Sequence, residues 1–457
     1  MDLARAQFAT TSLYHFIFVP LTLGLAPIVA TMQTLWHRSG DEAWLKLTRF
    51  FGTLLLINFA IGVATGLVQE FQFGMNWSVY SKYVGNIFGA PLAIEGLAAF
   101  FLESTFLGLW IFGWKRLPPR VHLATIWLAA LGTWLSGYFI LVANSWMQHP
   151  VGYTVSDGKA VLTSLSAVMF SDFALWAYGH VILAGLTVGA TVVFGVACWH
   201  LVRGNDRELF LRAAKLALII LVPVAATNLW FGSHFGIYAT KTQPMKIAAT
   251  EGLWNTAQPA PFSLFQIGGF SQSDETPSFE IKVPGLLSFL ATGSFNGKVV
   301  GINQNERQLE RQYGRADDIP PVEVTYWAMR GMAYLGTLVF VVAALGAWFY
   351  RRRTLERHRW FLWTAVVAIA FPFLASLAGW VLTEVGRQPW IVYGLLRTSE
   401  ATSPNVGTTT IAVSLGVFLA LYVVLGFLDF ILMRRYARPA TGTPQEAPPE
   451  EQPVVSF

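Results

Sequence analysis

The segment GWVLTEVGRQPW, Gly379–Trp390, places an ionisable glutamate, Glu384, at the end of a long apolar run. Arg387 follows three residues later, and Gly386 and Pro389 predict a turn by which the chain leaves the apolar environment. A charged side chain at the centre of a bilayer costs roughly 2.5 to 3.5 kcal/mol, even on the scale that penalises it least. We therefore treat every ionisable residue within an apolar run of this chain as a candidate site residue.

The composition identifies the class of protein. The chain has 457 residues, of which 54% are hydrophobic and 12% charged, and its mean hydropathy is +0.49. A soluble domain has about twice that charged fraction, so the sequence predicts a polytopic membrane protein. Cys198 is the only cysteine, which excludes an intrachain disulfide and a cysteine-ligated zinc or iron–sulfur site. Any metal must be held by His, Met or carboxylate groups.

Apolar runs of about 20 residues, long enough to cross the hydrocarbon, predict nine transmembrane helices in an all-α protein. They cover approximately residues 12–35, 50–70, 92–114, 122–146, 176–200, 213–235, 324–350, 360–383 and 409–433. The chain then divides into helices one to six (1–235), a polar loop (236–323), helices seven to nine (324–436) and a tail (437–457). A loop this long is usually functional or disordered.

Basic residues predict the orientation. Eighteen Lys and Arg residues lie in the loops after helices one, three, five and seven and after the last helix, whereas five lie in the short opposite segments. The positive-inside rule therefore puts the N-terminus outside, the C-terminus in the cytoplasm and the long loop outside the cytoplasm. The first apolar run is too long for a cleaved signal peptide. The tail is rich in Pro and Glu, so we expect it to be disordered, and the net charge of +5 reflects basic loops rather than nucleic-acid binding.

Several ionisable or metal-ligating side chains fall within about three helical turns of the predicted outer face. They are His15, Glu95, His180, Arg330, Met332 and Glu384. Each has a plainer explanation: a membrane histidine can be a packing residue, Met332 alone can be core filler, and Glu384 can pair with Arg387 at the interface. Together, however, two histidines, a methionine and a carboxylate at one depth are the axial ligand types of haem iron.

Two acids lie on the third predicted helix. Glu95 and Glu103 are eight residues apart, which is about 12 Å along a helix with 1.5 Å rise per residue, and they differ by about 80° in azimuth. With Ser104 beside the deeper acid, they could be steps of a proton path from the middle of the membrane. The alternative is a pair of acids hydrogen-bonded between helices.

Four stretches together resemble subunit I of the cytochrome bd family of quinol oxidases, over about residues 5–435. They are SLYHFIFVPLTLG (Ser12–Gly24), GNIFGAPLAIEGLAAFFLESTFLGLWIFGW (Gly85–Trp114), LVANSWMQHPVG (Leu141–Gly152) and GWVLTEVGRQPW. The nine helices and the extracytoplasmic loop also agree with that family, and the loop length is similar to its short-loop branch. The resemblance implies a terminal respiratory quinol:oxygen oxidoreductase of the bacterial cytoplasmic membrane, which generates proton motive force without a pump.

The resemblance also implies roles for individual residues, which we state as expectations. His15 is expected to ligate haem d at the oxygen-reducing site, Glu384 the iron of haem b595, and His180 with Met332 the iron of haem b558. Further roles are implied beside the haems (Arg330, the propionate-binding Arg387 and Trp380), at the oxygen site (Glu95), in the proton path (Glu103, Ser104 and Ser136) and in quinol binding (Lys246 and Glu251). The sequence around His180, WAYGHVILAG, departs from the family pattern.

The implied partners are quinol, O2, membrane lipid and a subunit II of homologous fold, and a small single-span subunit is compatible with the family. Two rival functions remain open. One is a cyanide-insensitive oxidase of the same type that carries a third haem b in place of haem d, which no residue distinguishes. The other is a proton-coupled transporter that uses Glu95 and Glu103, although such proteins usually show internal repeats and paired broken helices, which this sequence lacks.

Overall fold

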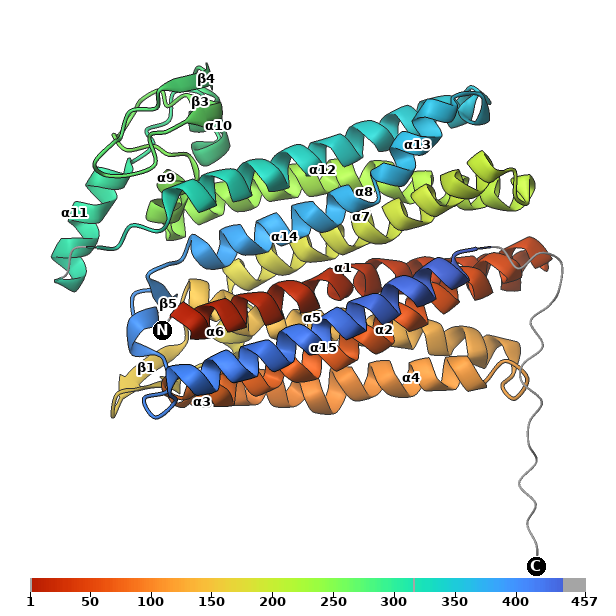
Figure 1. Cartoon of the computed structure of the whole chain (residues 1–457), viewed down its shortest axis with the longest axis horizontal. Helices are drawn as coiled ribbons and strands as arrows, with labels where there is room; N and C mark the ends of the chain where they lie inside the picture. The colour runs from red at the N-terminus through yellow and green to blue at the C-terminus, as the bar shows by residue number, and fades with distance from the viewer. Residues whose placement is uncertain (1, 315–316, 439–457) are drawn as a thin grey trace, which may run out of the picture.

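The structure is a computed structural model that describes residues 2–314 and 317–438. Within these residues, nine helical segments are long and apolar enough to cross a membrane, and they run side by side as one bundle (Figure 1). They are Asp2–Ser39, Glu42–Met75, Ser78–Phe112, Pro119–Gln148, Leu165–Arg203, Arg207–Thr242, Val322–Arg351, Arg359–Val385 and Thr408–Tyr436. The predicted all-α fold and number of spans are confirmed, and most helices extend beyond the predicted spans at both ends. Most of the predicted tail, residues 437–457, lies outside the described residues.

Three of the nine segments contain more than one element. The third consists of α3 (Ser78–Ile94), a π-helical stretch (Glu95–Phe100) and α4 (Phe101–Phe112); the fifth of α6 (Leu165–Met169) and α7 (Asp172–Arg203); and the eighth of α13 (Arg359–Val367) and α14 (Ala370–Val385). The others are single helices, labelled α1 (Asp2–Ser39), α2 (Glu42–Met75), α5 (Pro119–Gln148), α8 (Arg207–Thr242), α12 (Val322–Arg351) and α15 (Thr408–Tyr436). Two short 3-10 helices, Leu355–Arg357 and Thr398–Glu400, complete the connections between these segments.

Local sequence explains where several helices begin and end. The Asp41 side chain accepts a hydrogen bond from the Ala43 amide at the start of α2, and Ser171 does the same for Ala174 at the start of α7. Helix α5 begins at Pro119, where the absent N–H costs nothing. Helix α7 ends at Gly204, which has a φ of 73° and so adopts the left-handed conformation that closes a helix.

Helix α1 lies at the centre of the bundle and packs against α2, α5, α7, α14 and α15. Its approach to α7 is very close. A Cβ atom on Gly24 would lie 1.9 Å from the Gly185 carbonyl oxygen, and one on Gly189 would lie 2.5 Å from the Gly24 carbonyl carbon. Small residues four apart are typical of tight helix contacts in membranes, so these glycines set the distance between the helices that carry His15 and His180.

The long connection between α8 and α12 is folded. Because α8 continues to Thr242, the connection starts later than the predicted residue 236. It contains α9 (Pro244–Thr250), the antiparallel strands β3 (Phe262–Ile267) and β4 (Phe279–Val283), α10 (Leu286–Thr292) and α11 (Ile302–Tyr313). Two small hairpins, β1 (Tyr153–Ser156) with β2 (Lys159–Leu162) and β5 (Trp390–Val392) with β6 (Leu396–Arg397), lie at the same end of the bundle as this connection and the start of α1 (Figure 1).

Candidate functional site

His15 on α1 is held by α2, through the Thr65 hydroxyl and the Gly62 backbone. Its Nδ1 lies 3.0 Å from Thr65 Oγ1, and that hydroxyl itself donates to the carbonyl oxygens of Ile61 and Gly62. The hydroxyl therefore accepts from the Nδ1–H, which leaves a lone pair on Nε2. Gly66 faces the ring, since a Cβ atom there would lie 3.1 Å from His15 Cε1. Nε2 is thus available as a metal ligand, with its orientation fixed by the bond at the other ring nitrogen.

His180 and Met332 each lie against a glycine of a neighbouring helix. A Cβ atom on Gly232 of α8 would lie 2.9 Å from His180 Cε1, and one on Gly379 of α14 would lie 2.9 Å from Met332 Sδ. The His180 Nδ1 atom is buried and has no hydrogen-bond partner among the described residues. The Asn228 side chain on α8 interacts with this histidine, and its Oδ1 is also buried without a well-formed hydrogen bond among the described residues.

Glu384 and Trp380 join α14 to the rest of the site. One carboxylate oxygen of Glu384 accepts from Asn144 Nδ2 on α5 at 2.7 Å, and the other accepts from Arg387 Nη2. The Trp380 ring, one turn earlier, stacks on Phe16 with the centroids 5.0 Å apart and the planes at 20°. Phe16 is the neighbour of His15, so this stack connects the helix turns of the two predicted high-spin haem ligands.

Arg387 is nearly fully buried, and its guanidinium is only partly paired. Nη2 donates to Glu384, whereas Nε and Nη1 have no partner among the described residues. Unpaired N–H groups of a buried arginine suit an anionic oxygen group such as a carboxylate, which a guanidinium binds with two parallel hydrogen bonds. The prediction that Arg387 binds haem propionates is compatible with this geometry.

The two acids of the third segment both bond to α5. Ser136 Oγ donates to Glu95 Oε1 at 2.6 Å, and Thr133 Oγ1 donates to Glu103 Oε1 at 2.7 Å. The π-helical stretch Glu95–Phe100 lies between the acids, so the azimuth of about 80° expected for a regular α-helix does not apply. Because the two hydroxyl residues are three apart on α5, they lie on one face of this helix, and each binds one of the two carboxylates.

Ser104 does not join this cluster. It is only partly exposed, and its hydroxyl donates to the Phe100 carbonyl of its own helix. Thr133 was missed by the sequence reasoning, although its spacing of three residues from Ser136 in the segment LGTWLSG placed both hydroxyls on one helical face.

Lys246 and Glu251, the predicted quinol-binding residues, are buried. Lys246 Nζ donates to Gln148 Oε1 at 2.6 Å, and its aliphatic chain passes Gly386, where a Cβ atom would lie 2.9 Å from Lys246 Cγ. Burial, together with the nearby charge of Arg387, lowers the pKa of Lys246 to about 7, and the charge of Glu384 opposes this change. The segment that carries Lys246 therefore packs against Gly386, at the start of the GRQPW turn.

Glu251 forms a buried ion pair with Arg330, with Oε2 and Nη2 2.8 Å apart. Burial raises the pKa of Glu251, and the Arg330 charge opposes this effect. Arg330 also donates to the carbonyl oxygens of Ser263 and Thr250, and its guanidinium lies 3.6 Å from the centroid of the Tyr326 ring. This one cation thus joins α12, the end of α9 and β3.

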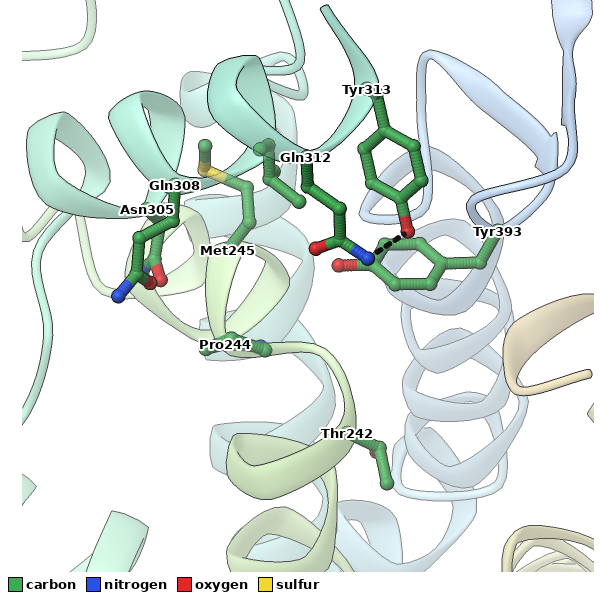
Figure 2. A pocket seen from close by; sticks show the side chains of 9 residues that line it. Thr242, Pro244, Met245, Asn305, Gln308, Gln312, Tyr313 and Tyr393 are labelled. Carbon is green, nitrogen blue, oxygen red and sulfur yellow. Dashed lines mark hydrogen bonds between the residues drawn. The ribbon is translucent and has the colours of Figure 1, made fainter.

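A pocket of about 260 Å³ opens beside α9, between α11 and the β5–β6 hairpin (Figure 2). In the figure, Gln312 Nε2 and the Tyr313 hydroxyl meet at 3.1 Å next to the Tyr393 ring. The lining is rich in amides and phenols and consists of Thr242, Pro244, Met245, Asn305, Gln308, Leu309, Gln312, Tyr313 and Tyr393. Neither predicted quinol-binding residue lines it, because both point into the bundle.

Comparison with known proteins identifies the family. The chain matches the family model described as cytochrome bd terminal oxidase subunit I over residues 3–441. It is similar to cytochrome bd ubiquinol oxidase subunit 1 of Bacillus subtilis (strain 168), with 44% identity over 96% of this chain and 94% of that protein. It is also similar to cytochrome bd-II ubiquinol oxidase subunit 1 of Escherichia coli (strain K12), with 37% identity over 99% of both chains. The fold resembles the bd oxidase from Geobacillus thermodenitrificans, with a TM-score of 0.86, 28% identity, and coverage of 95% of this chain and 97% of that one. The chain therefore belongs to the cytochrome bd terminal oxidase subunit I family.

Proposed function

We propose that this chain is the haem-carrying subunit of a terminal respiratory quinol oxidase. It oxidises quinol at the outer face of the membrane and reduces O2 to water with protons taken from the cytoplasm. Family membership supports the reaction class, because the relatives described above are named ubiquinol oxidases. The observation on this chain that carries the proposal is the stack of Trp380 on Phe16, which joins the helix turns of Glu384 and His15. Since the two half-reactions release and take up protons on opposite sides, turnover charges the membrane without a pump.

Three haems would be held by four side chains: His15 for haem d, Glu384 for haem b595, and His180 with Met332 for haem b558. Bound there, the haems supply the one-electron steps and the iron at which oxygen is reduced. A ligand pair on both faces of one iron suits electron transfer, whereas a single protein ligand leaves a face for oxygen.

The surroundings of these ligands fit such groups. His15 keeps a lone pair on Nε2, and the Asn228 side chain interacts with His180. Gly232 and Gly379 leave room beside His180 and Met332 that a Cβ atom would fill. The unpaired N–H groups of Arg387 suit a propionate, in agreement with the role implied for that residue.

The chain's own residues would conduct the protons for oxygen reduction. Glu103 receives a proton from the cytoplasmic side, and the hydroxyls of Thr133 and Ser136 connect it along α5 to Glu95. Each hydroxyl can both donate and accept a hydrogen bond, as a step of a proton path requires. Ser104 lies outside this cluster, so it remains a candidate only for delivering protons to Glu103.

Quinol would be oxidised beside the segment that carries Lys246 and Glu251. In this proposal the two residues act from beneath the substrate: Lys246 ties α9 to Gln148, and Glu251 ties it to Arg330, two residues before Met332. Both residues then lie beside the route by which electrons pass from quinol to the low-spin haem, while the quinol protons are released at the outer face.

The nine apolar helices agree with a multi-pass protein of the bacterial cytoplasmic membrane. We propose subunit II as the obligatory partner, with a small single-span subunit as a further component of the complex. Both assignments follow from the family.

One absorption spectrum of the purified, dithionite-reduced complex tests the proposal. We expect a band near the red edge from haem d together with b-type bands; b-type bands alone would instead identify the oxidase with three b haems, and a colourless protein would reject the function. Met332→Leu should remove the low-spin b-type signal, whereas the control Met329→Leu on the same helix should not. A low-spin signal that survives in Met332→Leu would reject that ligand.

A further inference from the structure

One face of α8 packs against the part of α7 that carries His180. The Phe235 ring lies beside the imidazole, with the centroids 6.3 Å apart. Gly232, about one turn earlier, faces the imidazole itself, since a Cβ atom there would lie 2.9 Å from His180 Cε1 and 3.4 Å from Nδ1. Residues three and four apart share a face of a helix, so the next position on this face is Asn228.

Asn228 brings an amide group to this contact between the helices. Its Oδ1 is buried and, like His180 Nδ1, has no partner within normal hydrogen-bond geometry among the described residues. The two side chains nevertheless interact with each other. Two buried polar atoms that both lack a partner are costly to the fold, and a single hydrogen bond between them satisfies both.

The chemistry of the two atoms gives the direction of this bond. An amide oxygen can only accept a hydrogen bond, so the imidazole of His180 must donate from Nδ1. A neutral imidazole that carries its proton on Nδ1 has its lone pair on Nε2, and the role of His180 as an iron ligand requires such a lone pair. His15 has the same arrangement, with the Thr65 hydroxyl as the acceptor.

We propose that Asn228 is a positioning residue for the low-spin haem, whose Oδ1 accepts the Nδ1–H of His180 and so fixes the tautomer and the orientation of the ring. Such an acceptor also makes the imidazole a more basic ligand, which favours ferric over ferrous iron. Asn228 therefore holds the midpoint potential of this haem below the value that His180 alone would give. The inference rests on the proposed function, in which His180 is a ligand of haem b558, and adds to it a residue outside the ligand set.

Redox titration of the complete oxidase, followed in the low-spin b-type absorption band, tests this role. Asn228→Leu has a similar volume but no acceptor, so the midpoint potential should rise. The affinity for this haem, measured by its transfer to an excess of a haem-accepting protein, should fall about 10- to 100-fold. Asn228→Asp keeps an acceptor and makes it more negative, so its midpoint potential should fall. Shifts in opposite directions separate an effect on the iron from a loss of packing, which would change the haem content alone.

Thr227→Val is the matched control. Thr227 precedes Asn228 on α8 and its side chain is exposed, so this variant should keep both the midpoint potential and the haem affinity. Wild-type potentials in both Asn228 variants would overturn the inference, and if Asn228→Leu does not assemble, an unchanged or raised potential in Asn228→Asp overturns it alone. A low-spin signal that survives in His180→Ala would instead reject the proposed ligand, whatever the Asn228 variants show.

Discussion

At the scale of single residues, burial decides what an ion pair contributes. Arg330 and Glu251 are both nearly inaccessible, and every guanidinium nitrogen of Arg330 donates to a carbonyl or carboxylate oxygen. Arg207 and Glu356 form a shorter pair, 2.6 Å apart against 2.8 Å, but the arginine side chain is 66% exposed. Water screens the second pair and can replace either partner, whereas nothing replaces a partner of the first.

This difference gives a prediction. Arg330→Gln leaves the Glu251 carboxylate buried without a counter-ion and should destabilise the subunit by about 3 to 5 kcal/mol. Arg207→Gln should leave the stability unchanged within error. Titration of the purified complex with a denaturing detergent, with unfolding as the readout, measures both changes in stability. The double variant Arg330→Gln/Glu251→Gln should recover part of the loss, because no unpaired charge remains; equal stability of the two single variants would contradict the argument.

At the scale of elements, the sequence predicts helices better than contacts between them. Nine apolar runs predicted nine spans because each helix must satisfy its own backbone inside the membrane, which is a local property of the sequence. The π-helical stretch at Glu95 was not predicted, because hydropathy does not distinguish a π turn from an α turn. The fold of the long loop was also not predicted, because α9 and β3 gain their positions from Gln148 and Arg330 on distant helices.

The contact between α1 and α7 tests how far packing determines the site. Gly189→Ala would place a methyl group 2.5 Å from the backbone of Gly24, so the two helices must separate. We expect a lower unfolding temperature, from overpacking that costs about 1 to 3 kcal/mol, and a loss of bound haem, since α1 and α7 carry His15 and His180. Calorimetry and haem content of the purified complex measure these effects.

Gly416→Ala on α15 is the control for this prediction, because a Cβ atom there meets nothing within 4 Å. Alanine favours a helix over glycine by about 1 kcal/mol, so this variant should be neutral or slightly more stable. If both glycine variants behaved alike, the close approach of α1 and α7 would not be required for the fold.

At the scale of the whole molecule, the site residues are drawn from helices at both ends of the sequence. The ligand candidates could be selected from the sequence, because each is an ionisable or sulfur-containing side chain in an apolar run; their common depth stays a prediction. Their partners could not: Thr65 beside His15 and Thr133 beside Glu103 come from the next helix along the chain, and Asn144 beside Glu384 comes from a helix 240 residues earlier. Such partners become visible only when the order of helices in the bundle is known.

The folded connection between α8 and α12 and the two hairpins all lie at the end of the bundle where α1 begins (Figure 1). The distribution of Lys and Arg predicts that this end faces outward, as quinol oxidation at the outer face requires. Chemical labelling of cysteines in intact cells tests this orientation. The chain is convenient for it, since Cys198 is its only cysteine and is fully buried, and Cys198→Ala provides the background.

In that background, Lys159→Cys in the β1–β2 hairpin and Ser273→Cys in the long connection should react with a membrane-impermeant maleimide in intact cells. Arg353→Cys, after α12 at the opposite end, should react only once the membrane is opened. All three positions are exposed, so a difference in labelling reports the side of the membrane and not burial. Labelling of Arg353→Cys in intact cells, with protection of the other two, would invert the orientation. It would also place quinol oxidation on the cytoplasmic side, which would remove the physical basis for charging the membrane without a pump.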